Sequence, residues 1–292
     1  MSRLACVDGE ILGPDQARVS VYDRGFLYGD SVFETIRTYG GKPFALDEHV
    51  RRLERSSELV GIQLPVEPSV LAAEIERSIF AAGNAECYVR VMITRGTGPL
   101  GLDPAHVMRP LRVILVEPLT PLPAAMYRDG VSVITYRTER ASDAAHGAKV
   151  GNYLSGMLAL RVARQTGAHE ALILDTKGRV TEGTTSNVFI VRGQTIVTPP
   201  DDAGILLGIT RAKIIEIAPQ IGLSVDYSLL VPADLATADE VFLSSSMREI
   251  LPVVRVDGVP VGNAKPGPTT RALHTAFRKM VGLENAPLPW EG

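Results

Sequence analysis

The feature that most constrains this fold is a proline cluster near the middle of the chain. Residues 117–123 read Glu-Pro-Leu-Thr-Pro-Leu-Pro, with three prolines in six residues. Proline lacks a backbone N–H and has a fixed φ, so neither a helix nor a central strand is expected to run through this segment. We therefore predict a linker over residues 118–123, an N-terminal α/β domain over 1–117 and a C-terminal α/β domain over 124–292. A chain of 292 residues is long enough for two domains.

The part before the linker is rich in predicted strands. Asp8-Gly9 and Gly40-Gly41 are typical of hairpin turns. Residues 31–39 mix β-branched and aromatic side chains, which favour a strand, and residues 87–94 indicate a buried strand. Two helices are expected as well, one after Pro68 and one over 47–60. The second would be capped by Asp47, with one apolar face made of Leu46, Val50, Leu53 and Val60.

After the linker, strands and helices alternate. Helices are expected from Leu154, near Ile209 and over 268–281, and Pro219 should end or kink the second of them. The first would bury an apolar face of Leu154, Met157, Leu158 and Val162. Strands are expected over residues 171–174, 186–191, 241–244 and 250–256. This mixture predicts an α+β or mixed α/β protein with two sheets, and the later domain would carry Lys149.

Composition excludes several classes of protein. The net charge is −3, without any block of like charges, which argues against nucleic acid or anionic membrane as a partner. Apolar runs such as 113–116 are far shorter than the roughly 20 residues that a bilayer requires. Too few apolar residues precede Asp8 for a signal peptide. With only Cys6 and Cys87, no disulfide framework is possible. A soluble cytoplasmic protein is expected.

Several common functional motifs are missing. The five histidines are scattered and none pairs at metal-ligand spacing, so no metal is expected. Neither a G-x-S-x-G elbow nor a P-loop occurs. A G-x-G-x-x-G does occur at Gly96, Gly98 and Gly101, but Leu102-Asp103-Pro104 follows and should not open the helix that dinucleotide binding requires. A turn is the favoured interpretation there.

Lys149 is the most suggestive single residue. Of the 30 basic residues, 24 are arginine and six are lysine, and Lys149 lies among small and apolar neighbours just before a predicted helix. A lysine shielded from water has a lowered pKa and becomes a usable amine nucleophile. The local context alone leaves open the alternative of an ordinary loop lysine.

Three other segments suggest anion binding. A helix that begins at Gly208-Ile209-Thr210 offers free backbone N–H groups to a phosphate. Ser244-Ser245-Ser246 offers hydroxyls at the end of a predicted strand, and Arg52 offers a guanidinium. A helix cap, a strand end and a surface arginine are the structural alternatives. Together with Lys149, these residues describe a phosphate pocket beside a reactive amine, which is what pyridoxal phosphate requires.

At this point the chain resembles the class IV, or fold-type IV, pyridoxal-phosphate aminotransferases over nearly its whole length. Six motifs occur in the family's order, which makes the resemblance very specific. They are Tyr28-Gly29-Asp30-Ser31-Val32-Phe33-Glu34, His49-Val50-Arg51-Arg52-Leu53, Lys149 with Asn152-Tyr153-Leu154, Thr181-Glu182-Gly183 with Ser186-Asn187-Val188-Phe189, Gly208-Ile209-Thr210-Arg211, and Ser244-Ser245-Ser246 with Glu249-Ile250-Leu251-Pro252-Val253.

The resemblance implies a role for each matching residue. Lys149 would bind pyridoxal 5'-phosphate as a Schiff base and later carry the proton, and Glu182 would hydrogen-bond the pyridine nitrogen. Tyr153 would lie near the phenolic oxygen of the cofactor, and Asn187 would order the Glu182 loop. The phosphate ligands would be Arg52, Ile209, Thr210 and Ser246. The implied reaction moves an amino group from an amino acid to a 2-oxo acid such as 2-oxoglutarate.

Within the family, the chain is most similar to the branched-chain aminotransferases. Tyr88-Val89-Arg90 resembles their Tyr-x-Arg site for the substrate carboxylate, and Tyr28 and Phe33 match their aromatic pocket walls. D-amino-acid aminotransferases carry an Arg-x-His trap where this chain has Leu100 and Leu102. The resemblance therefore favours L-branched-chain substrates and a homodimer with active sites near the subunit interface.

Three departures keep other activities open. Thr35 replaces a usual glycine, Met247-Arg248 replace two small residues, and Lys149 and Tyr153 are four apart, one fewer than in some members. Arg248 would either anchor a second carboxylate or point to solvent. D-amino-acid or (R)-amine transamination and aminodeoxychorismate lyase activity remain alternatives. The complete set of Lys149, Glu182 and Arg52 argues against a non-catalytic binding protein without cofactor.

Overall fold

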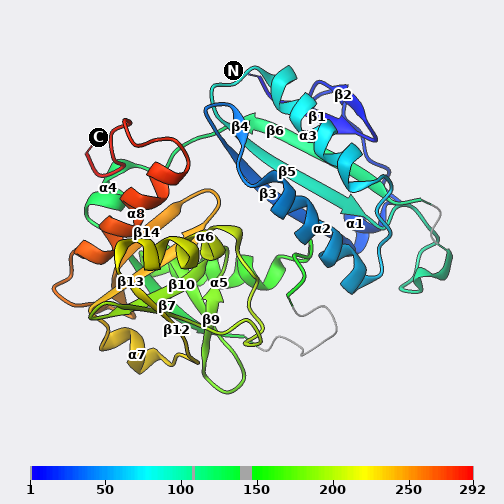
Figure 1. Cartoon of the computed structure of the whole chain (residues 1–292). Helices are drawn as coiled ribbons and strands as arrows, with labels where there is room; N and C mark the ends of the chain where they lie inside the picture. The colour runs from blue at the N-terminus through cyan, green and yellow to red at the C-terminus, as the bar shows by residue number, and fades with distance from the viewer. Residues whose placement is uncertain (1, 107–108, 139–146, 292) are drawn as a thin grey trace. The chain divides into compact units, whose positions relative to one another are not determined.

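The chain divides into two compact units. The structure is a computed structural model that describes residues 2–106, 109–138 and 147–291 (Figure 1). The first unit comprises Met1–Thr120 and Asp143–Tyr153, and the second comprises Pro121–Ser142 and Leu154–Gly292. In the described part of the chain, no helix has the length and apolar character needed to span a bilayer.

The first unit contains a sheet in which all neighbouring strands are antiparallel. The strand order is β2-β1-β6-β5-β3-β4. Both predicted hairpin turns are confirmed, at Asp8-Gly9 and at Gly40-Gly41. The strands are β1 (Leu4–Val7), β2 (Glu10–Leu12), β3 (Ser31–Tyr39), β4 (Lys42–Pro43), β5 (Cys87–Thr94) and β6 (Leu111–Pro118). β3 and β5 have the predicted bounds, whereas β6, which was not predicted, extends into the proline cluster.

Two long helices cover one face of this sheet, α2 (Leu46–Val60) and α3 (Pro68–Ala82) (Figure 1). The helix α1 (Arg24–Tyr28) and a 3-10 turn at Pro104–His106 complete the unit. The predicted cap of α2 is wrong: the N-cap is Ala45, at φ 51°, and Asp47 lies inside the first turn. There its charge still faces the positive end of the helix dipole. Val50 and Leu53 are buried against the sheet as predicted.

The second unit contains a mixed sheet with the order β12-β11-β10-β13-β14-β7-β8-β9, and β15 pairs with β14. Three pairs are parallel, β7 with β8, β7 with β14 and β11 with β12. The strands are β7 (Val131–Arg137), β8 (Glu170–Leu174), β9 (Val180–Gly183), β10 (Asn187–Arg192), β11 (Thr195–Thr198), β12 (Ser224–Tyr227), β13 (Glu240–Ser245), β14 (Glu249–Val256) and β15 (Val259–Pro260). Two sheets with helices confirm the predicted mixed α+β class.

The helices of the second unit are α4 (Ala124–Arg128), α5 (Leu154–Gln165), α6 (Ile209–Ile217), α7 (Pro232–Ala236) and α8 (Pro268–Met280). α6 ends before Pro219, which lies in a 3-10 turn at Ala218–Ile221, as predicted. The predicted buried face of α5 is wrong, because Leu154 and Met157 are each 64% exposed. Instead, Ala159 and Ala163 pack on β8, since small side chains let a helix approach a sheet closely.

The segment that bears Lys149 belongs to the first unit, not to the C-terminal part of the chain as predicted. Its residues lie along the free edge of β3. The Phe33 N–H donates to the Lys149 carbonyl at 3.0 Å, and the Gly151 N–H donates to the Ser31 carbonyl at 2.7 Å. A Cβ on Gly151 would lie 2.1 Å from Ser31 Oγ, so this close approach requires glycine. These backbone bonds explain why the chain returns to the first unit between β7 and α5.

Candidate active site

Phe33 is the centre of a cluster around the Lys149 amine. Lys149 Nζ lies 4.6 Å from the centroid of the Phe33 ring and donates a hydrogen bond to Tyr153 Oη at 3.3 Å. The Tyr153 ring meets Phe33 edge-on, with the two centroids 5.2 Å apart. The Lys149 backbone N–H donates to Ser56 Oγ at 3.1 Å. The structure therefore brings together three of the predicted site residues, and it adds Ser56 as an unpredicted support.

Arg90 contacts the same aromatic ring. Its guanidinium carbon lies 4.0 Å from the Phe33 centroid. Tyr88 shares that face of β5 two residues away, and both side chains are half-buried. The Phe33 ring is thus flanked by the amine of Lys149 and the guanidinium of Arg90, which are the two cations expected to meet an amino-acid substrate.

Arg52 is held by a buried glutamate that sequence reasoning missed as a site residue. Arg52 Nε and Nη2 donate to the two carboxylate oxygens of Glu34, both at 2.7 Å. His49 Nδ1 lies 2.7 Å from Glu34 Oε2. The Glu34 side chain is 1% exposed, against 12% for Arg52. The signal was present in the sequence, because Glu34 alternates with Phe33 on β3 and so faces the helices that cover the sheet.

The charges of this cluster follow from its burial. Burial by itself raises the pKa of a carboxyl, but the charge of Arg52 and the hydrogen bonds from Arg52 and His49 lower the pKa of Glu34 to about 2. Burial lowers the pKa of His49, and the positive charges of Arg52 and Lys149 lower it further against the effect of Glu34. His49 is therefore neutral at pH 7 and donates its Nδ1 proton to the ionised Glu34.

This cluster predicts a pH-dependent contribution of Glu34 to stability. The folded-state pKa of about 2 lies below the ordinary 4.5, so the ionised carboxylate stabilises the fold above pH 4.5. That contribution, on the order of 3 kcal/mol at pH 7, is lost as the pH falls through the folded-state pKa. Glu34→Gln should lower Tm strongly at pH 7 and much less at pH 3, in thermal unfolding followed by circular dichroism. The exposed Glu10→Gln is the control, and an equal Tm loss at both pH values would contradict the assignment.

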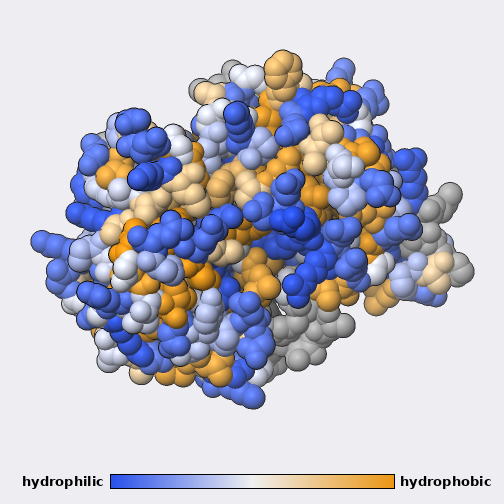
Figure 2. Space-filling view, in the orientation of Figure 1, coloured by the Kyte–Doolittle hydropathy of each residue, from blue (hydrophilic) through white to orange (hydrophobic). Residues whose placement is uncertain are grey.

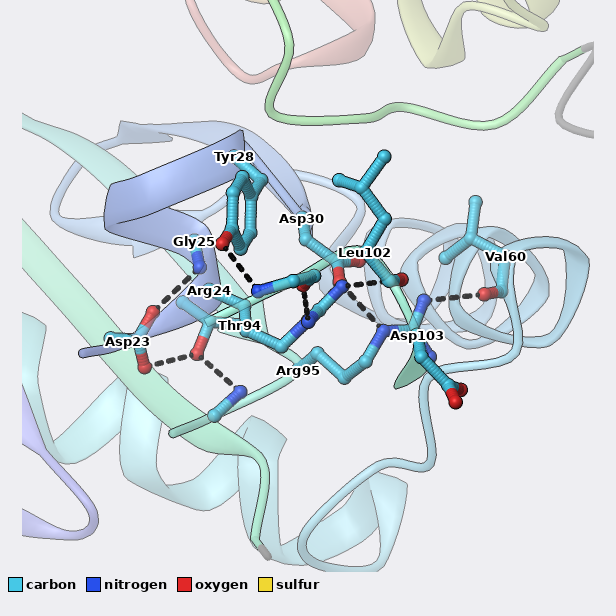
Figure 3. Close-up of polar contacts among 12 residues, drawn as sticks. Asp23, Arg24, Gly25, Tyr28, Asp30, Val60, Thr94, Arg95, Leu102 and Asp103 are labelled. Carbon is cyan, nitrogen blue, oxygen red and sulfur yellow. Dashed lines mark hydrogen bonds and ion pairs between the residues drawn. The ribbon is translucent and has the colours of Figure 1, made fainter. Parts of the chain in front are cut away.

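Tyr28 is tied to the loop that follows β5 (Figure 3). Its hydroxyl accepts a hydrogen bond from the Gly101 N–H at 3.0 Å. Arg24, on the same short helix, donates to the Gly101 carbonyl and also to Asp30, which pairs with Arg95. Figure 3 shows both arginines pointing at the Asp30 carboxylate. These hydrogen bonds hold the loop that carries Leu100 and Leu102 against the helix α1, which carries Tyr28.

In the second unit, Glu182 and Asn187 bind the same residue of the 201–208 loop. Glu182 Oε2 accepts from the Leu206 N–H at 2.9 Å, and Asn187 Nδ2 donates to the Leu206 carbonyl at 2.8 Å. Both side chains are buried. Leu206, which sequence reasoning missed, therefore links the two predicted residues, Glu182 and Asn187.

The start of α6 suits a phosphate group. Gly208 is its N-cap, without a side-chain cap, so backbone N–H groups of Ile209 and Thr210 are available to an anion. The Thr210 hydroxyl is buried and has no hydrogen-bond partner among the described residues. A Cβ on Gly208 would lie 2.0 Å from Asn187 Oδ1, so the helix start sits directly against the Glu182–Asn187 pair. Ser246 lies half-buried at the turn after β13.

These residues fit pyridoxal phosphate. In the second unit, the unpartnered Thr210 hydroxyl and the uncapped helix start match the chemistry of a phosphate, and the Glu182 carboxylate matches that of a ring nitrogen. In the first unit, taken by itself, the Lys149 amine matches the chemistry of an aldehyde. Within the described ranges, no group of three or more His, Cys, Asp or Glu side chains is arranged to hold a metal ion.

Comparison with known proteins identifies the family. Residues 31–256 match the family described as amino-transferase class IV. The chain is 38% identical to the putative branched-chain-amino-acid aminotransferase of Methanocaldococcus jannaschii, over 94% of this chain and 95% of that protein. It is 31% identical to the D-alanine aminotransferase of Bacillus licheniformis, over 96% of this chain and 97% of that protein. It is 33% identical to the aminodeoxychorismate lyase of Bacillus subtilis, over 94% of each.

A solved structure shows the same fold. The Escherichia coli branched-chain amino acid aminotransferase superposes with a TM-score of 0.91 at 31% identity, covering 99% of this chain and 98% of that chain. A further structural neighbour, also a branched-chain amino acid aminotransferase, was solved with pyridoxamine 5'-phosphate. The family match spans most of the chain, and the relative from Methanocaldococcus jannaschii covers nearly all of it, so the protein belongs to the class IV aminotransferases, which use pyridoxal 5'-phosphate.

Proposed function

We propose that this aminotransferase moves the amino group of an L-branched-chain amino acid to a 2-oxo acid such as 2-oxoglutarate. The observation that carries the proposal is the placement of Arg90 and Lys149 against one ring, 4.0 and 4.6 Å from the Phe33 centroid. A substrate whose amino group is at Lys149 can place its carboxylate toward Arg90. A guanidinium suits a carboxylate because its planar N–H groups match both oxygens.

The sheet around Arg90 is suited to an aliphatic side chain. Phe33 pairs with Met92 across β3 and β5, and Met92 pairs with Val113 across β5 and β6. These three neighbours place apolar side chains on the same face of the sheet as Arg90. An apolar surface beside the Arg90 guanidinium favours leucine, isoleucine or valine as the substrate.

The proposed chemistry divides between the cofactor and the chain. When bound, pyridoxal phosphate supplies an aldehyde that reacts with amines and a ring that withdraws electrons. Lys149 is proposed as the nucleophile and the general base that moves the proton, with Tyr153 Oη holding its amine. Glu182 is proposed to favour protonation of the ring nitrogen. The proposed phosphate ligands are Arg52 in the first unit and Ile209, Thr210 and Ser246 in the second.

D-amino-acid transamination and lyase activity are the competing functions, since relatives of both kinds cover the chain. Leu100 and Leu102, where a D-amino-acid enzyme is expected to carry charge, are 71% and 78% exposed and apolar. They offer no group that would bind a carboxylate. A half-reaction panel separates the activities: L-branched-chain amino acids should discharge the bound cofactor's visible absorption faster than D-amino acids or (R)-amines.

We also propose a homodimer. Val21, Phe26, Leu100 and Leu102 are each more than half exposed, and the bonds of Arg24 and Tyr28 to Gly101 place the last two beside α1. An apolar patch of this kind is typical of a protein–protein interface. Figure 2 shows hydrophobic residues between hydrophilic ones on the face of the molecule that it displays. A particle mass of two chains in light scattering would support the dimer.

We further propose a cytoplasmic location, which is consistent with the two free, buried cysteines. We also propose that each of the two compact units is a domain.

Arg90→Met tests the carboxylate site. The variant should lose about tenfold to hundredfold in kcat/KM for L-leucine, because a hydrogen bond to a charged group contributes roughly 1.5–3 kcal/mol. It should lose far less with an (R)-aryl ethylamine, which has no carboxylate. The measurement is kcat/KM for both substrates, with the exposed Arg51→Met as the control. Equal proportional losses for the two substrates would show that Arg90 supports the site without binding the carboxylate.

A further inference from the structure

Arg248 is engaged inside the second unit, neither free for a substrate nor pointing to solvent. It lies at the turn between β13 and β14, two residues after Ser246, and its side chain is 20% exposed. Arg248 Nη1 donates to Glu170 Oε2 at 2.6 Å, and Nη2 donates to Thr185 Oγ1 at 2.7 Å. The two terminal nitrogens thus bind two different partners, at the start of β8 and in the turn after β9.

Glu170 is a fully buried anion that organises the turn after β9. Its side chain is 0% exposed at the start of β8. Its Oε1 accepts from Thr184 Oγ1 at 2.9 Å and from the Thr185 N–H at 2.7 Å. Its other oxygen accepts from Arg248. A buried carboxylate needs a compensating charge, and Arg248 supplies it.

The turn held by Glu170 directly follows Glu182. A Cβ on Gly183 would lie 2.8 Å from Glu170 Oε1 and 2.2 Å from Ser186 Oγ. The backbone at Gly183 therefore passes close to the Glu170 carboxylate. Thr184 and Thr185 follow Glu182 by two and three residues, so these hydrogen bonds hold the chain close to Glu182.

The turn that carries Arg248 is fixed independently. The Arg248 carbonyl accepts from Tyr127 Oη at 3.0 Å. Glu249 adopts φ 57°, which is unusual for a residue with a side chain, and its carboxylate lies 2.6 Å from His274 Nε2. The Arg248 side chain therefore joins two turns that are each held by further hydrogen bonds, one after Glu182 and one after Ser246.

We propose that Arg248 is a positioning residue that sets the separation between these two turns. With that separation fixed, Glu182 and Ser246 meet the ring nitrogen and the phosphate of one cofactor at the same time. Arginine suits this role because its planar fork binds two partners in fixed directions, whereas a lysine ammonium acts as a point charge. The inference rests on the roles proposed above for Glu182 and Ser246.

The test is titration of the cofactor-free protein with pyridoxal phosphate. Arg248→Met should raise Kd by about tenfold to hundredfold, as expected for loss of charged hydrogen bonds. Arg248→Lys keeps the charge near Glu170 and should fold like the wild type, yet raise Kd by several-fold and shift the pH midpoint of the bound cofactor's visible absorption. Arg255→Met removes an exposed arginine of β14, the strand that follows the turn, and should change neither quantity. Wild-type Kd and absorption in both Arg248 variants would overturn the proposal.

A double variant separates positioning from charge balance. Arg248→Met leaves Glu170 as a buried, unpaired charge, and adding Glu170→Gln removes that charge. The Tm of the cofactor-free double variant should recover. The Kd for pyridoxal phosphate should stay raised, because the double variant has no guanidinium at position 248 to join the two turns. If Kd recovers together with Tm, Arg248 only balances charge and the proposal is wrong.

Three further measurements distinguish this proposal from the proposals on substrate and phosphate binding. If Arg248→Met has unchanged affinity for pyridoxal phosphate but a raised KM for amino acids, Arg248 binds the substrate carboxylate and the proposal is overturned. Ser246→Ala, titrated in parallel, tests the phosphate site on which the inference rests. A wild-type preference for D-amino acids would revise the proposed substrate and leave these cofactor titrations unaffected.

Discussion

Lys149→Ala should abolish transamination while leaving the fold intact. The amine lies against Phe33 and Tyr153, where it serves the proposed chemistry. Loss of a nucleophile that is also the general base should lower kcat by at least about 10³-fold. The backbone bonds of residue 149 to Phe33 and Ser56 do not involve the lysine side chain, so they persist in the variant. Initial rates with L-leucine and thermal unfolding of the cofactor-free protein measure the two effects.

A chemical experiment checks the same residue without relying on activity. Borohydride reduction of the wild-type holoenzyme should attach the cofactor covalently to Lys149, as located by peptide mass spectrometry. Lys177→Ala removes an exposed lysine and should change neither activity nor labelling. Covalent label on another lysine, or near-normal turnover by Lys149→Ala, would disprove the assignment.

Glu182→Gln should retain the cofactor but lower kcat by about 10²–10³-fold, the usual cost of removing one electrostatic group at a reacting centre. A glutamine still presents an oxygen to the Leu206 N–H, so the contact of the wild-type Oε2 at 2.9 Å can be kept. It lacks the negative charge that favours protonation of the ring nitrogen. Single-turnover rates with L-leucine under saturating cofactor measure the chemical step.

The control for this prediction is an exposed glutamate, Glu284→Gln, which should behave as the wild type. Cofactor affinity is measured alongside the rates. A variant with the wild-type rate would remove Glu182 from the proposed mechanism. A variant that loses cofactor and rate in parallel would indicate that the Glu182 contact with Leu206 is structural.

Most secondary structure near the site was predictable because local rules dominate it. The hairpin turns at Asp8-Gly9 and Gly40-Gly41 and the strands β3 and β5 follow from turn chemistry and strand propensity. α5 was predicted as a helix, but its buried face was not. Four large apolar residues outweighed Ala159 and Ala163 in the pattern, although the small residues are the ones that pack on β8.

The site shows a similar division. Lys149, Arg52 and Glu182 were recognisable in the sequence because their motifs are specific. Their partners were not assigned. Alternation along β3 places Glu34 on the face that the helices cover but does not show that it meets Arg52, 18 residues away, and Leu206 lies 24 residues from Glu182. Such pairs form only when strands and helices pack, and a sequence pattern carries no record of which distant residues then meet.

The amino-acid sequence by itself therefore determined the family and the cofactor, because the motifs that identify them depend on residue type at short spacing. Tertiary structure decided which unit carries Lys149 and what Arg248 does. The first depends on hydrogen bonds between residues 149–151 and the edge of β3, which lies far earlier in the chain. The second depends on a buried carboxylate at Glu170, whose need for a compensating charge directs the Arg248 guanidinium inward.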